Sequence, residues 1–311
     1  MFDCSRWFEL TRYTGDAEVG MPNQQQPSAI PEFARRRARA LIGWLPVNEG
    51  ALCLAGRQME QQANPDHVAR CETARQAVAA RPPGIDQNAL VAELPGTLQP
   101  HVDAIRQTAI GAQILQESGE PKWVDLAKVC AAQPQIFVED AARRVEGISA
   151  DDLAKLAAIT LPVPTPTQMP VAFDKAKNAW IVSSPNPNLR VAGNFNTPVG
   201  PGLMGLGFAV TLGVSYVHVA RLGDRYFLRD GYHRAYGLMA VGVRFAPALV
   251  TEYNSFEEVG LPQGLLPQAA YLGDRPPLLR DYLDDTVAAD TSVPAAQKTV
   301  VVQALEVSSV G

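Results

Sequence analysis

The chain has 311 residues, of which 47% are hydrophobic and 19% charged, a composition typical of a folded globular protein rather than a disordered one. Its formal net charge of −5 argues against a large nucleic-acid-binding surface, because non-specific binding depends on Lys and Arg neutralising phosphates. The sequence contains neither a run of about 18 apolar residues nor the apolar segment of a signal peptide, so we expect a cytoplasmic protein that does not cross a membrane.

The four cysteines give no sign of a metal site or a disulfide framework. None of Cys4, Cys53, Cys71 and Cys130 has a partner at the short spacing that zinc sites use. We expect buried or incidental thiols, and no metal site is predicted.

Residues 1–30 are polar and are interpreted as an N-terminal arm. Residues 31–160 are rich in helix-forming residues and are punctuated by helix-start signals such as Pro31. The expected helices cover residues 31–42, 64–81, 87–93, 100–117, 123–132, 136–145 and 150–158. This region therefore predicts a small all-α domain that could bind a protein partner. The basic run Arg35–Arg39 is expected on a solvated helix face.

Residues 161–170 alternate proline with other residues, a pattern typical of a stiff linker. Residues 171–311 then change to short β-rich runs. The expected strands cover 170–173, 179–183, 215–221, 225–228, 245–252 and 298–307, with helices at 235–241 and 278–289. The glycine-rich stretch 200–207 lacks the end of a P-loop and is expected to be a mobile loop or lid. The predicted fold class is α+β: an N-terminal all-α helical domain followed by an α/β domain.

The most informative segment is the turn Asp230-Gly231-Tyr232-His233-Arg234, which lies between an expected strand and an expected helix. A helix that begins there points its free N–H groups and its positive dipole end at the turn. Gly231 allows a ligand to approach the backbone, and Arg234 can hold phosphate oxygens. A plain capped turn with a solvated first helical turn is the structural alternative.

A hairpin with Gly223-Asp224 at its turn, followed by this Asp-Gly-X-His-Arg turn, a helix and a further strand, resembles the core of the ParB/sulfiredoxin superfamily. The resemblance covers roughly residues 178–252. It implies that Gly231, Tyr232, His233 and Arg234 bind nucleotide phosphates. It also implies, from the segment Asn186-Pro187-Asn188-Leu189-Arg190, that Asn186, Asn188 and Arg190 lie near the nucleotide.

Two departures from the superfamily narrow the prediction. Tyr232 stands where sulfiredoxin has its cysteine, and the segment after Glu252 does not match the partition proteins. We therefore predict a nucleotide-binding protein that uses ATP or another nucleotide with Mg²⁺, in phosphoryl transfer or nucleotide hydrolysis. Asp230, His233 and Glu252 are the candidate catalytic residues. The alternatives are a non-catalytic interaction scaffold with a degenerate pocket and a partition-type DNA-binding protein; an oligomer is compatible with each.

Overall fold

The computed structural model describes residues 35–56, 64–165, 169, 171–184, 189–261, 264–294 and 298–303. The expected arm at residues 1–30 lies outside them. The fold is a mixture of helices and sheets, as expected. Its helices are α1 (Val47–Leu54), α2 (Pro65–Ala79), α3 (Gln99–Arg106), α4 (Ala109–Glu117), α5 (Val138–Arg144), α6 (Leu153–Thr160), α7 (Tyr232–Ala240), α8 (Phe256–Val259) and α9 (Gln268–Leu272). Three 3₁₀ turns are η2 (Gly96–Leu98), η3 (Leu126–Lys128) and η4 (Leu279–Leu283).

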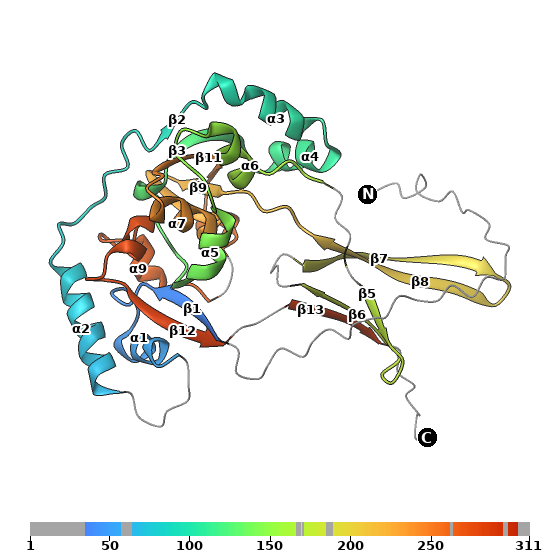
Figure 1. Ribbon diagram of the computed structural model, residues 1–311, viewed down its shortest axis with the longest axis horizontal. Helices are drawn as coiled ribbons and strands as arrows, with labels where there is room; N and C mark the ends of the chain where they lie inside the picture. The colour runs from blue at the N-terminus through green and yellow to red at the C-terminus, as the bar shows by residue number, and fades with distance from the viewer. Residues whose placement is uncertain are drawn as a thin grey trace. The chain divides into compact units, whose positions relative to one another are not determined.

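Figure 1 shows the strands together with these helices. They are β1 (Arg35–Ala40), β2 (Val91–Ala92), β3 (Glu120–Asp125), β4 (Gln135–Phe137), β5 (Val171–Asp174), β6 (Ala179–Ser184), β7 (Leu189–Gly200), β8 (Leu203–Leu212), β9 (His218–Leu222), β10 (Arg225–Asp230), β11 (Phe245–Tyr253), β12 (Ala289–Pro294) and β13 (Lys298–Gln303).

The central sheet has five strands in the order β10-β9-β11-β3-β2. β9 and β10 form an antiparallel hairpin, α7 follows, and β11 returns parallel to β9. The hairpin, helix and strand predicted for this stretch are therefore confirmed. β3 pairs antiparallel with β11, so a strand from residues 31–160 completes the sheet of the later half.

A second sheet joins the two halves again, in the order β12-β1-β4. The described part of residues 31–160 thus contains four strands, and the all-α prediction for this region is wrong. The strands on either side of residues 161–170 share two sheets, so the expected helical domain is not a separate folding unit.

β1 shows why the helix prediction failed. Ala38 and Ala40 are fully buried while Arg37 and Arg39 alternate with them, which is the period of two of a strand. The arginines are held by carboxylates: Arg37 and Arg39 contact Asp290 on the paired strand β12. This run is therefore an ion-paired strand rather than a solvated helix face.

Three further helix predictions are wrong, because these segments form short strands and turns instead. Residues 87–93 contain only the short strand β2, and residues 123–132 contain the end of β3 and η3. The carboxylate of Asp125 accepts the N–H of Ala127, which turns the chain at the end of β3. Residues 278–289 form η4 and lead into β12, while the expected helix at 100–117 is divided into α3 and α4.

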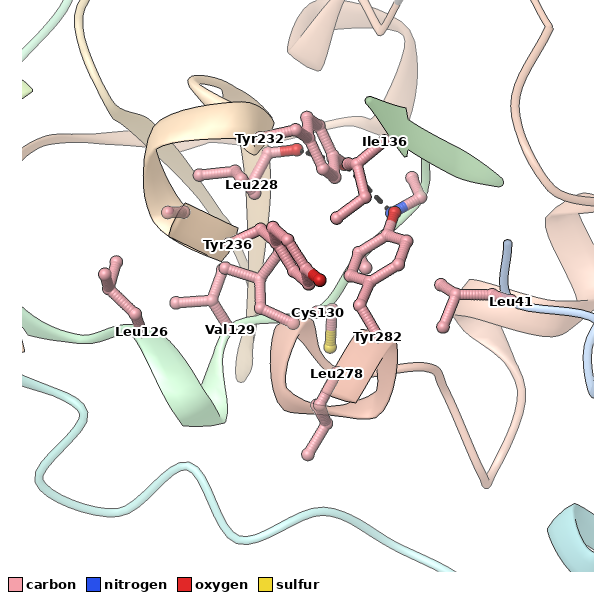
Figure 2. Packing of buried hydrophobic residues seen from close by; sticks show 14 of the residues in the cluster. Leu41, Leu126, Val129, Cys130, Ile136, Leu228, Tyr232, Tyr236, Leu278 and Tyr282 are labelled. Carbon is pink, nitrogen blue, oxygen red and sulfur yellow. Dashed lines mark hydrogen bonds between the residues drawn. The ribbon is translucent and has the colours of Figure 1, made fainter. Parts of the chain in front are cut away.

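The larger hydrophobic core contains residues of both halves, from Ala40 to Ala288, and a smaller cluster forms around Ile105 and Leu249. Figure 2 shows the tyrosines at its centre, with Tyr232 and Tyr236 from α7 facing Tyr282 from η4. Cys130 is also buried there, and burial raises the pKa of its thiol to about 12. Together with buried Cys53 and Cys71, this confirms the expectation of buried thiols for three of the four cysteines; Cys4 lies outside the described residues.

The segment between α6 and β9 leaves the core and returns to the same place. The N–H of Val217 donates to the carbonyl of Thr160 over 2.8 Å, so the departing and returning chains lie one hydrogen bond apart. Between them lie β5 and β6, which form a sheet with β13, and the hairpin of β7 and β8. The expected lid at 200–207 is part of this hairpin. The described part of the chain contains no helix of the length and apolarity that crossing a membrane requires.

Candidate functional site

The predicted turn opens into a cavity of about 1090 Å³. All five residues of the turn, Asp230 to Arg234, line it. Its other walls come from α5, from the end of α6 and from the two chain segments that lead out of and back into the core. The residues from which the sequence predicts a phosphate site thus lie in a real concavity.

A β-bulge at the end of β10 directs two neighbouring charged residues to the cavity. Leu228 pairs with Val219 and Asp230 with His218, so Arg229 is the extra residue between them. Successive residues of a regular strand point to opposite faces, whereas a bulge changes the direction of a side chain. Both Arg229 and Asp230 therefore line the cavity.

Gly231, the residue before α7, has a conformation that requires glycine. Its φ is +93°, in the left-handed region, and an added Cβ would lie 2.9 Å from the Cα and Cγ2 of Val217. The tight approach brings the first turn of α7 against Val217, the residue before β9. The positive end of this nine-residue helix therefore faces the cavity.

Arg234 is only 5% exposed, and its guanidinium joins the two chain segments that border the cavity. It donates to the carbonyl of Ile159 over 3.1 Å and to both the carbonyl and the hydroxyl of Ser215. The Ser215 hydroxyl in turn donates to Asp230 over 2.8 Å. Burial lowers the pKa of Arg234 to about 10, which leaves the guanidinium charged at neutral pH.

Tyr232 lines the cavity, but its hydroxyl belongs to the core. The hydroxyl donates to the carbonyl of Leu228 over 2.6 Å and accepts the N–H of Ala132 over 2.9 Å. Burial raises the pKa of this hydroxyl above its ordinary range. The predicted ligand-binding role is therefore limited to the ring and backbone of Tyr232, because its polar atom holds α7 against the core.

His233 lies in the cavity wall with its ring stacked on Phe137, at a centroid distance of 5.4 Å. Its Nε2 is buried and has no hydrogen-bond partner among the described residues. Burial, together with the charges of Arg144 and Arg234, lowers the pKa of His233 to about 4. The imidazole is therefore neutral at pH 7.

Two further arginines in the cavity were not singled out by the sequence. Arg229 is half-buried and donates to the hydroxyl of Tyr253 over 2.8 Å. Arg144, in the last turn of α5, is exposed, and no ion pair or hydrogen bond holds it within the described ranges. With Arg234 they give the described lining three arginines against the single carboxylate of Asp230, in a chain of net charge −5.

His218 and Tyr216 add two buried polar groups. His218 Nε2 lies 2.8 Å from the Thr251 hydroxyl, which itself donates to the carbonyl of Ser118. Because the hydroxyl has one proton, Nε2 must be the donor, and burial lowers the pKa of His218 to about 4. Tyr216 is 4% exposed, and its hydroxyl has no partner within the described part of the chain.

The remaining predicted site residues are not brought into the cavity. Glu252 is 74% exposed and forms an ion pair with Arg221 across β9 and β11. It does not line the cavity, so the structure gives it no place in the chemistry predicted for it. Asn186 and Asn188 lie outside the described residues. The backbone of Arg190 belongs to β7.

Comparisons with models of known protein families, with curated proteins and with solved structures found no match to this chain. The resemblance to the ParB/sulfiredoxin superfamily therefore rests on the motif and its setting. Within the residues that the structure describes, no group of three or more His, Cys, Asp or Glu side chains forms a metal site.

Proposed function

We propose that the protein binds a nucleotide, with its phosphates in the cavity at the first turn of α7. The observation that carries the proposal is the convergence of Arg144, Arg229 and Arg234 on the N-terminus of that helix. Such an end offers free N–H groups and a partial positive charge to an anion. The two histidines beside it are neutral, so the arginines supply the positive charge.

The cavity also suits the rest of a nucleotide. Its volume of about 1090 Å³ is slightly larger than the range of roughly 300–1,000 Å³ for small-molecule sites, which leaves room for a nucleotide. The unpartnered hydroxyl of Tyr216 and the Nε2 of His233 are buried polar atoms for which a bound ligand would provide hydrogen bonds. The ring of Phe137 lies among the lining residues.

ATP with Mg²⁺ is the nucleotide that we propose first. Mg²⁺ usually binds through one or two carboxylates together with substrate phosphates, and Asp230 supplies one carboxylate beside the arginines. Phosphoryl transfer or hydrolysis depends mainly on positioning and charge neutralisation. Arg144 and Arg234 would neutralise the phosphates, and neutral His233 could accept a proton from a hydroxyl or a water.

The test is a thermal-shift series with ATP, ADP, CTP, GTP, pyrophosphate and adenosine, each with and without Mg²⁺. A ligand at about 100 times its Kd adds roughly 2.7 kcal/mol to the free energy of unfolding. Arg144→Ala should weaken nucleotide binding about tenfold or more, since a hydrogen bond to a charged group contributes roughly 1.5–3 kcal/mol. Arg234 is a poorer probe because its guanidinium also holds the backbone.

Arg143→Ala is the matched control. Arg143 is the neighbouring residue of α5, is 73% exposed and does not line the cavity. Its substitution should leave binding unchanged. If no nucleotide or pyrophosphate stabilises the protein, the proposal is wrong. If both substitutions weaken binding equally, the ligand lies elsewhere. Phosphate release should then be measured with the nucleotide that binds best.

A further inference from the structure

The hairpin of β7 and β8 has open edges. The two strands pair antiparallel with each other, and no third strand joins them among the strands that the structure describes. An isolated two-stranded sheet is marginally stable in water, and each outer edge presents unpaired N–H and C=O groups. A hairpin this long is therefore expected to be completed by another strand.

The two edges differ in how they are protected. β7 contains Pro198, which has no N–H to donate, and β13 also contacts β7. Proline and charge are the usual devices that prevent an edge strand from pairing. β8 has the sequence Leu-Met-Gly-Leu-Gly-Phe-Ala-Val-Thr-Leu, with no proline and no charged residue over ten residues. The unprotected edge is thus that of β8.

An exposed apolar stripe follows the same strand. Met204 is 60% exposed, and Phe208 is 48% exposed. They lie an even number of residues apart and so share one face of the hairpin with Val210. Val191, which is 50% exposed, pairs with Val210 across the hairpin and extends the stripe onto β7. The side chains beside the open edge are therefore themselves uncovered.

We propose that β8 pairs antiparallel with β8 of a second copy of this chain, about a two-fold axis, to form a four-stranded sheet. An identical partner is favoured because the edge carries no charge that would repel its own copy. Each hairpin has one edge, that of β8, that neither proline nor charge protects, so pairing through this edge ends at a closed dimer instead of continuing into a filament. This inference does not depend on the nucleotide proposal.

The stripe restricts the register of this pairing. Residues directly opposite in an antiparallel pair point to the same face. If Gly207 lies on the two-fold axis, Met204 faces Val210 of the second copy, and the two stripes join. In any register where the numbers of two opposing residues add up to an even number, residues of the apolar stripe stay opposite one another, and the stripe continues across the interface. Odd sums would place the large side chains of one copy beside the small residues of the other.

The first experiment measures the mass of the full chain by sedimentation velocity over a wide range of protein concentration. We expect a monomer–dimer equilibrium, and the double substitution Met204→Lys with Phe208→Lys should abolish the dimer. Val199→Lys is the matched control, because Val199 is also 60% exposed but belongs to β7. A wild-type chain that stays monomeric, or a dimer that survives the double substitution, overturns the proposal.

A second experiment tests the geometry without adding charge. Single cysteines are placed in turn along β8 in a Cys4→Ser background, in which the described native thiols are buried. Antiparallel pairing about a two-fold axis predicts fast self-cross-linking at one central position and a steep decline toward both ends. Equal cross-linking at every position, or faster cross-linking from cysteines in β7, overturns the proposed arrangement.

Discussion

The core and the segment between Thr160 and Val217 differ in how their strands pair and in how far their side chains are buried. In the core, strands from distant parts of the sequence pair with one another, as β1 does with β12, and the side chains that face inward are almost fully buried. In the departing segment, β7 and β8 are neighbours in sequence, and large apolar residues such as Phe195 and Leu203 are half or more exposed.

This difference indicates where stability and function reside. Long-range pairing around a buried core fixes the geometry of the cavity, since Gly231, Tyr232 and Arg234 are all held by core contacts. The departing segment buries few of its own side chains. Its stability therefore depends on contacts with whatever covers its exposed surface. Three perturbations should separate the two regions, the first with the largest expected effect and the last with the smallest.

Acidification should destabilise the core alone. His218 and His233 have a pKa of about 4 in the folded protein, against 6.5 for an exposed histidine, and residues 171–212 contain no histidine. As the pH falls below 6.5, the histidines of the unfolded chain become protonated before those of the folded protein. The free energy of unfolding therefore falls between pH 6.5 and 4, by up to roughly 3 kcal/mol for each histidine. Urea unfolding followed between pH 7 and 5 measures the loss before most carboxylates titrate. A profile that is unchanged when both histidines are replaced by Gln would contradict this assignment.

Glycine-to-alanine substitutions compare the regions at matched backbone conformations. Gly231 and Gly202 both have positive φ, of 93° and 70°, but only Gly231 is crowded, whereas nothing lies within 4 Å of a Cβ at Gly202. Gly231→Ala should cost roughly 2–4 kcal/mol, from strain and overpacking together. Gly202→Ala should cost about 1 kcal/mol locally and leave the main transition in place. Equal effects on the main unfolding transition would mean that the hairpin and the core unfold as one unit.

Trp180→Ala should give the smallest effect. Trp180 is 55% exposed, and its ring packs on Phe173 of the adjacent strand at a centroid distance of 4.8 Å. Loss of such a cross-strand aromatic pair costs about 0.5–1.5 kcal/mol. Hydrogen exchange should become faster in β5, β6 and β13 and stay unchanged in the central sheet. Faster exchange throughout the core would show that the sheet of β6 supports it.

The sequence was informative where the structure depends on neighbouring residues. The hairpin turn at Gly223-Asp224 and the glycine at the start of α7 are local signals, so the unit from β9 to β11 could be predicted. β1 could not, because its alternation of Arg and Ala becomes a strand only through pairing with Pro294 and its neighbours, more than 250 residues away.

The candidate site also divides into residues that are close together in the sequence, which could be predicted, and residues from distant segments, which could not. The five residues of the turn were found because they are contiguous. Arg229 stood directly before them, but only the bulge directs it to the cavity. Arg144 comes from a helix some 90 residues earlier, and no sequence pattern links it to the turn. Glu252 is a candidate from the sequence, whereas the structure pairs it with Arg221 on the adjacent strand.

The hydrogen bond between Val217 and Thr160 makes the intervening segment resemble an insertion in an otherwise continuous domain. Departure and return at one point mean that a short connector could replace β5 to β8, residues 171–212, while Ser215 and Tyr216 stay in the cavity wall. β13 pairs with β6 and with no other described strand, so it would then be dispensable as well. The domain that remains would be a minimal scaffold, in which the turn at Asp230–Arg234 could be studied apart from any assembly that the hairpin directs.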